Sequence, residues 1–138
     1  MFTKEKHMSN SGDCIVAVAA DKALADLTQT FKDNLRKPNA KLNIIIQVGD
    51  LTEQINASGS SKLVLTHPND IVIRKSNYIS DRTLAIDADK SSNDLSRKLI
   101  AKLKNPKQKF IFIKINAVLF LPFCILVGFL LQLNVVLN

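Results

Sequence analysis

The second half of the chain repeats the first half at a fixed offset of 68 residues. Asp21-Lys22 returns as Asp89-Lys90, and Asp26-Leu27 returns as Asp94-Leu95. Identical residues would coincide by chance at only about one position in fifteen. The sequence therefore predicts two related units, in which any site built by one unit can exist in two versions. The apolar positions follow the same shift without a gap, in the pairs Val16/Leu84, Val18/Ile86, Phe31/Leu99 and Leu42/Phe110.

Each unit is predicted to contain three strands, a helix and a closing strand, and only the second copy is complete. In the first copy, the apolar run 14–20 predicts a buried strand, and 24–35 predicts a helix that ends before Pro38. The run 41–48 predicts the closing strand. The other predicted elements are a connector at 49–61, strands at 63–66, 70–74 and 83–86, a helix over 95–103 capped by Ser91 or Ser92, and a strand at 110–115.

These elements place the chain in the α+β class, with two β-β-β-α-β units in a mostly antiparallel sheet system. We expect a duplicated domain over residues 1–116, with units of about 1–48 and 49–116, followed by a hydrophobic segment over 117–138. The first unit begins in its second strand, which predicts either a truncated chain or a different start. One continuous sheet and two packed sheets are both compatible with this pattern.

A net charge of +7 and a pI near 9.6 suit an anionic partner, such as a phosphate-bearing metabolite, nucleic acid or an anionic membrane surface. Solubility alone is the other explanation of this charge. Cys14 and Cys124 have neither C-x-x-C nor metal-ligand spacing, which predicts a reducing compartment and no metal site. The sequence contains no Gly-rich phosphate loop and no nucleophile motif, so no cofactor is predicted and enzymatic activity is left open.

The polar segment 66–75 is the first candidate site. His67 can act as an acid, a base or a ligand near neutral pH, and Asp70 follows it at the same predicted turn. Arg74 and Lys75 come next and can hold a phosphate or a carboxylate. The structural alternative is a Pro-Asn turn that His67 caps, followed by a solvated basic strand end.

Two Asp-Lys pairs form the second candidate site. Asp21-Lys22 and Asp89-Lys90 both lie between a predicted strand and a predicted helix, where ligands often meet backbone N–H groups. The structural alternative is an acidic residue that the helix dipole favours near the helix N-terminus. Both copies must make the same turn, so the repetition of the pair fits either interpretation.

Several motifs together resemble an archaeal family that is catalogued as domain of unknown function 371. The motifs are Ser11-Gly12-Asp13-Cys14-Ile15-Val16, Ala20-Asp21-Lys22-Ala23, the segment from Thr66 to Ser76, and Arg82-Thr83-Leu84-Ala85. The resemblance covers roughly residues 2–115. It implies an archaeal, intracellular protein and no particular activity. The family opens with a further segment containing Gly-His-Pro-Asn and Thr-His motifs, which this chain lacks.

The uncharged segment 117–137 is long enough for a spanning helix, which needs about 20 mostly apolar residues. The basic stretch from Arg97 to Lys114 would keep the domain cytoplasmic and favour anionic lipid. The sequence therefore predicts a membrane protein with a single C-terminal pass. A damaged reading frame is the rival explanation of this segment, and it predicts a cytoplasmic protein.

Three function classes follow from these features. The leading hypothesis is a cytoplasmic-side binding module for an anionic small molecule, held by the two candidate sites. The alternative is a non-catalytic interaction protein anchored at the membrane by the apolar segment. The third is RNA binding through the basic surface.

Overall fold

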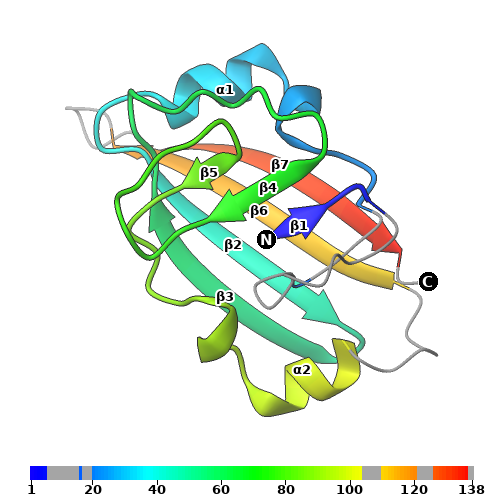
Figure 1. Cartoon of the computed structure of the whole chain (residues 1–138). Helices are drawn as coiled ribbons and strands as arrows, with labels where there is room; N and C mark the ends of the chain where they lie inside the picture. The colour runs from blue at the N-terminus through cyan, green and yellow to red at the C-terminus, as the bar shows by residue number, and fades with distance from the viewer. Residues whose placement is uncertain (6–15, 17–19, 104–109, 121–125, 137–138) are drawn as a thin grey trace.

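The chain folds into an α+β structure with few helices and mostly antiparallel strands, as the sequence predicts (Figure 1). A computed structural model describes residues 1–5, 16, 20–103, 110–120 and 126–136, with side chains described up to residue 102. In chain order the elements are β1 (Phe2–Thr3), the 3-10 turn η1 (Leu24–Asp26), α1 (Gln29–Leu35), β2 (Lys41–Val48), β3 (Leu51–Ser58), β4 (Asp70–Ile73), β5 (Thr83–Ala85), the 3-10 turn η2 (Ser92–Asp94), α2 (Arg97–Leu103), β6 (Phe110–Phe120) and β7 (Leu126–Val136).

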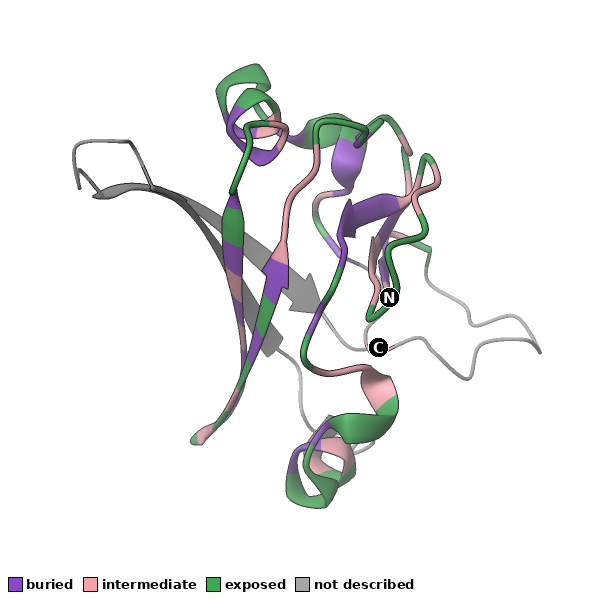
Figure 2. Cartoon of the chain, turned by 90° about the vertical axis from the view of Figure 1, so that its left-hand side faces the viewer, coloured by how far each residue is buried: buried purple, intermediate pink, exposed green. Residues whose placement is uncertain are grey.

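The strands form two separate sheets. The larger sheet has the order β3-β2-β6-β7, and all of its pairs are antiparallel. The smaller sheet has the order β1-β4-β5, in which β4 and β5 run parallel. The smaller sheet faces the larger one, and α1 and α2 lie at opposite ends of the space between them (Figures 1 and 2). The question of one sheet or two is thereby settled in favour of two.

One hydrophobic core fills the space between the sheets. Buried and more exposed residues alternate along β2, the pattern of a strand with one buried face (Figure 2). Phe2, Ile71 and Leu84 of the smaller sheet belong to the same buried cluster. Phe31 of α1 and Leu99 of α2 complete it from the two ends. Both sheets and both helices are therefore held by burial of the same apolar surface.

Two local predictions are wrong. The predicted connector 49–61 contains β3, because a two-residue turn after Val48 folds the chain back onto β2. Gly49 has a φ of 60° in this turn, a conformation that glycine adopts readily. The predicted strand 63–66 does not form, since Leu65 has a left-handed φ of 59°. The guanidinium of Arg36 instead donates hydrogen bonds to the main-chain carbonyls of this segment.

The two predicted helices are each interrupted near their start. Leu27 has extended backbone between η1 and α1, and Leu95 has the same conformation after η2. Thr28 caps α1 by accepting the N–H of Phe31, and Ser96 accepts the N–H of Leu99 in the same way. The bounds of η1 and α1 recur as those of η2 and α2 with the shift of 68 residues.

Where the structure describes the apolar C-terminal segment, at residues 117–120 and 126–136, it forms strands and not the predicted helix. Residues 117–120 continue β6, which pairs with β2, and β7 pairs antiparallel with β6 over residues 126–136. A run of apolar residues is compatible with a strand as well as with a buried helix, and here the neighbouring strand satisfies the backbone groups. Within the part of the chain that the structure describes, no helix has the length and apolar character to cross a membrane. This finding overturns the predicted single-pass membrane localisation.

Two carboxylates close the 3-10 turns and make folding sensitive to acid. Asp94 accepts the backbone N–H and the hydroxyl of Ser91 and pairs with Lys75, and these contacts lower its pKa to about 2. The pKa of Asp26 is lowered in the same way, mainly by the hydrogen bond from the backbone N–H of Ala23 and to a smaller extent by the ion pair with Lys4. A carboxylate with a lowered pKa stabilises the fold above the pKa of the unfolded chain, about 3.9, and stops doing so as the pH falls through the folded value.

We therefore expect the free energy of unfolding to decrease as the pH falls from about 4 to about 2. Asp94→Asn should weaken this pH dependence, because the amide still accepts the N–H of Ser91 but does not titrate. Urea unfolding curves at several pH values in this window measure the effect. Asp81→Asn, at an exposed carboxylate without an ion pair in the described part of the chain, is the matched control. Equal pH dependence in the two variants would contradict the prediction.

Candidate functional site

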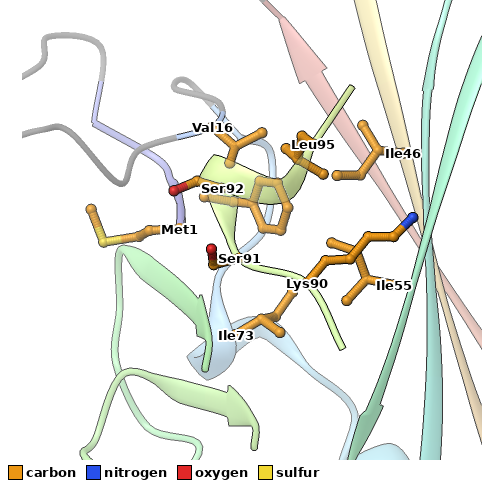
Figure 3. A pocket seen from close by; sticks show the side chains of 10 residues that line it. Met1, Val16, Ile46, Ile55, Ile73, Lys90, Ser91, Ser92 and Leu95 are labelled. Atoms are coloured by element: carbon orange, nitrogen blue, oxygen red, sulfur yellow. The ribbon is translucent and has the colours of Figure 1, made fainter. Parts of the chain in front are cut away.

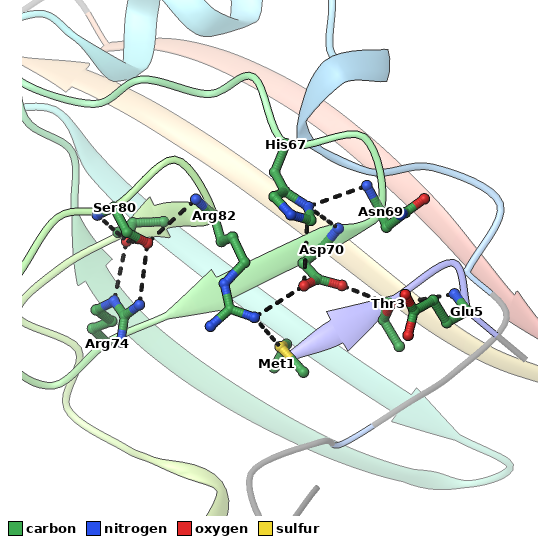
Figure 4. Close-up of polar contacts among 10 residues, drawn as sticks. Met1, Thr3, Glu5, His67, Asn69, Asp70, Arg74, Ser80 and Arg82 are labelled. Carbon is green, nitrogen blue, oxygen red and sulfur yellow. Dashed lines mark hydrogen bonds and ion pairs between the residues drawn. The ribbon is translucent and has the colours of Figure 1, made fainter. Parts of the chain in front are cut away.

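His67 caps the turn that leads into β4. Its Nδ1 accepts the backbone N–H groups of Asn69, at 3.2 Å, and of Asp70, at 2.9 Å (Figure 4). A nitrogen that accepts hydrogen bonds carries no proton, so the neutral imidazole holds its hydrogen on Nε2. Nδ1 is therefore occupied in the turn, and only the Nε2 edge of His67 is left for contact with a ligand.

Asp70 connects β1, β4 and the loop before β5. Its Oδ1 accepts the hydroxyl of Thr3 at 2.7 Å, and its Oδ2 accepts Nη1 of Arg82 at 3.1 Å. The Asp70 side chain is 12% exposed, whereas that of Arg82 is 43% exposed. His67 Nδ1 lies 3.9 Å from Asp70 Oδ2, so His67 and Asp70 share one cluster, as the sequence predicts for these two residues (Figure 4).

Arg74 lies in a second polar cluster, with Arg82 between it and His67 (Figure 4). Its Nε donates to the Thr83 hydroxyl at 3.1 Å, and Nη2 donates to the Ser80 hydroxyl at 3.2 Å. Its guanidinium carbon lies 4.9 Å from the centre of the Tyr78 ring, within cation–π distance. We name Arg74, Tyr78, Ser80 and Thr83 the Arg74 cluster. It joins the end of β4 to the start of β5.

The other sequence-predicted residues take separate partners. Lys75 pairs with Asp94 at 3.1 Å. Asp89 accepts the backbone N–H of Asn56 at 2.9 Å and thereby ties the chain before η2 to β3. Asp21 is exposed and Lys22 is half-buried, both just before η1. The structure therefore gathers the predicted residues into several small networks.

Lys90 lines a shallow pocket with its alkyl stem (Figure 3). Its ammonium group points away from Ser91 and Ser92 and donates to Glu53 at 2.7 Å. This contact raises the pKa of Lys90 and lowers that of Glu53. The pocket holds about 300 Å³, including space open to solvent. Its lining consists of Met1, Phe2, Val16, Ile46, Ile55, Ile73, Lys90, Ser91, Ser92 and Leu95.

Sequence reasoning missed Tyr78, Ser80, Arg82 and Thr83. A signal was present, since the ten residues from Arg74 to Thr83 contain two arginines and several hydroxyl side chains. The meaning of that signal depends on the parallel pairing of β4 with β5, which sets Val72 beside Thr83. Local periodicity does not reveal such a pairing.

Comparisons with known proteins give one family model and one relative. Residues 1–117 match the family model described as Domain of unknown function (DUF371). Over 108 residues the chain is 45% identical to an uncharacterized protein of Methanocaldococcus jannaschii, and the match covers 78% of each chain. The resemblance stated from the sequence motifs is thus confirmed, and the chain belongs to the DUF371 family.

Proposed function

We propose that this protein binds a small anionic molecule through the guanidinium of Arg74. The observation that carries the proposal is a positive charge that is held in place without a carboxylate partner. Within the described residues, the guanidinium of Arg74 donates only to the neutral hydroxyls of Ser80 and Thr83 and forms no ion pair. Hydroxyls fix the orientation of a guanidinium and leave its charge available to an anion.

Other basic side chains contrast with Arg74. Arg82 pairs with Asp70, and Lys90 pairs with Glu53. Arg36 donates to two main-chain carbonyls and lies 3.9 Å from Asp33. Lysines such as the exposed Lys62 have flexible stems, so they lose more conformational freedom on binding than a side chain that is already held in place. Arg74 therefore combines a fixed position with a charge that no acid neutralises in the described part of the chain.

The unused donors of Arg74 suit a phosphate or a carboxylate. A guanidinium has five N–H donors. Thr83 accepts the one on Nε and Ser80 accepts one of the two on Nη2, so the other donors are available to a ligand. Carboxylates and phosphates accept two parallel N–H bonds from a guanidinium. Because Arg74 is already oriented, less side-chain entropy is lost on binding than at a free surface arginine.

We also propose that the chain consists of two related units, of which only the second carries this site. The identical spacing of η1 with α1 and of η2 with α2 supports the relationship. With the shift of 68 residues, the counterparts of the Arg74 cluster are Lys6, Asn10, Gly12 and Ile15. The first unit thus lacks the hydroxyls and the aromatic ring that hold Arg74.

Replacing Arg74 by glutamine tests the binding proposal. We expect inorganic phosphate to bind the wild type saturably at constant ionic strength, and to bind Arg74→Gln about tenfold or more weakly, because one charged hydrogen-bonding group is lost. Isothermal titration calorimetry measures both affinities, and circular dichroism checks that the variant folds. Lys62→Gln removes the same charge elsewhere and should bind like the wild type. Equal weakening in both variants, or no saturable binding to the wild type, would refute the proposal.

A further inference from the structure

Tyr78 is an exposed aromatic side chain, whereas most of the large apolar residues with described side chains are buried. It is 61% exposed, and within the described residues Val64 is the other exposed large hydrophobic residue. Its backbone N–H donates to the Ser76 hydroxyl at 3.4 Å, and its ring is covered by the Arg74 guanidinium on one side. The ring is therefore held by local contacts while much of its surface stays open to solvent.

An accessible ring beside a guanidinium is the combination that binds nucleobases. A base stacks on an aromatic ring regardless of its identity, and an arginine adds both stacking and charge. Arg74 supplies the charge at 4.9 Å from the ring centre and retains N–H donors for a phosphate. From this arrangement we infer that the anion bound at Arg74 is the phosphate of a nucleoside phosphate, whose base stacks on Tyr78. This inference rests on the proposed function.

Arg82 borders the Arg74 cluster through its main chain. Arg82 follows Ser80 closely, and its backbone N–H donates to the same Ser80 hydroxyl that Arg74 contacts. Its side chain is 43% exposed and keeps further donors beyond the pair with Asp70. The charge of Arg82 is offset by Asp70, so the charge available to a phosphate here is that of Arg74.

The aromatic content of the chain favours a free nucleotide over a nucleic acid strand. The sequence contains one Tyr and no Trp, and two of its seven phenylalanines, Phe2 and Phe31, belong to the core. Proteins that bind single strands stack successive bases on several aromatic side chains. Among the side chains that the structure describes, Tyr78 is the one exposed aromatic ring, which provides for one base, so a mononucleotide is the ligand that this surface fits.

Because Tyr78 is the only tyrosine, its ring can be observed without assignment. Protein labelled with ¹³C in the tyrosine ring is titrated with AMP, with UMP and with inorganic phosphate, and proton–carbon NMR spectra are recorded. We expect the nucleotides to shift the Tyr78 ring protons upfield, because a stacked base shields them, and inorganic phosphate to leave them nearly in place. AMP should also bind about tenfold more tightly than phosphate, the gain from one stacked base.

Two variants separate the stacking contribution from the charge contribution. Tyr78→Phe should keep the tighter binding of AMP, whereas Tyr78→Ala should bind AMP only as well as phosphate. If phosphate binds but AMP binds no better, or if Tyr78→Ala keeps the preference for AMP, the nucleotide inference is overturned and the proposed anion site stands. If neither ligand binds, both are overturned. A ten-nucleotide single-stranded RNA distinguishes a free nucleotide from a nucleic acid strand. If the RNA binds no better per site than UMP, the free nucleotide is the ligand. Much tighter, salt-sensitive binding of the RNA overturns that choice.

Discussion

Gly59→Ala is expected to lower the free energy of unfolding by about 3 kcal/mol or more, because the new methyl group overpacks a closed site. A Cβ built at Gly59 would lie 2.2 Å from the main-chain oxygen of Leu35 and 3.0 Å from the Cβ of Ala40. The backbone at Gly59 cannot move away easily, since its N–H donates to the Ala40 carbonyl at 2.9 Å. The close approach holds the end of α1 against the chain that leaves β3.

Urea unfolding of the wild type and of Gly59→Ala measures this loss. Ser61→Ala is the matched control, because Ser61 is an exposed residue in the same segment. A surface substitution of that kind changes stability by about 0.5 kcal/mol at most. If both variants unfold at the same urea concentration, the close contact between Gly59 and Leu35 is not what stabilises this junction.

Asp70→Ala is expected to lower the free energy of unfolding by about 2–3 kcal/mol. The substitution leaves the buried hydroxyl of Thr3 without an acceptor and removes the ion pair of Arg82. The cost stays below that of a fully buried ion pair, since the exposed part of Arg82 regains contact with water. Asp70→Asn keeps an acceptor for the Thr3 hydroxyl, so its free energy of unfolding should fall by less than that of Asp70→Ala.

A double-mutant cycle with Thr3→Val isolates the contact between β1 and β4. The coupling energy between the two substitutions should be about 1 kcal/mol, the value of a buried hydrogen bond. Chemical unfolding of the four proteins supplies the cycle. Additive effects would show that Asp70 and Thr3 stabilise the fold independently, against the geometry of their 2.7 Å contact.

The parts of the fold that the sequence predicts correctly are those with a local pattern. Along β2, the buried Leu42, Ile44 and Ile46 alternate with more exposed residues, so the strand is visible without knowledge of its partners. Asp70 to Ile73 and Thr83 to Ala85 likewise show short runs with β-branched residues. In these segments, local preference and tertiary packing agree.

The incorrect predictions concern segments whose conformation is decided by distant residues. Polar residues in β3 and the following Gly59-Ser60-Ser61 resemble a loop, and only pairing with β2 makes the segment a strand. The run from Leu63 to Leu65 resembles a strand, but the carbonyls of this segment accept hydrogen bonds from Arg36 at the end of α1. The apolar segment 117–137 fits a lipid-embedded helix or a paired strand equally well by composition, and its pairing with β2 through β6 cannot be read locally.

In the candidate site, too, some residues can be predicted from the local sequence and others depend on distant pairing. Arg74 stands out in the sequence because it is a basic residue at a predicted strand end. Its partners Ser80 and Thr83 do not stand out, since hydroxyl residues are common in loops. Their role depends on β4 and β5 running parallel, which returns the chain to Arg74 after a short connection. The sequence offers the capping of the turn by His67 as the structural alternative at this segment, because such a cap needs only the neighbouring residues.

The pairing of β2 with β6 has a consequence for synthesis on the ribosome. The β2–β3 hairpin is local and can close within about 10 μs of its emergence. The other edge of β2 stays unpaired until Phe112, the partner of Gln47, is added about 65 residues later. At about 5–20 residues per second, this delay is roughly 3–13 s. During that interval the nascent chain exposes a strand edge rich in isoleucine, the kind of surface to which holding chaperones bind and through which unfinished chains aggregate.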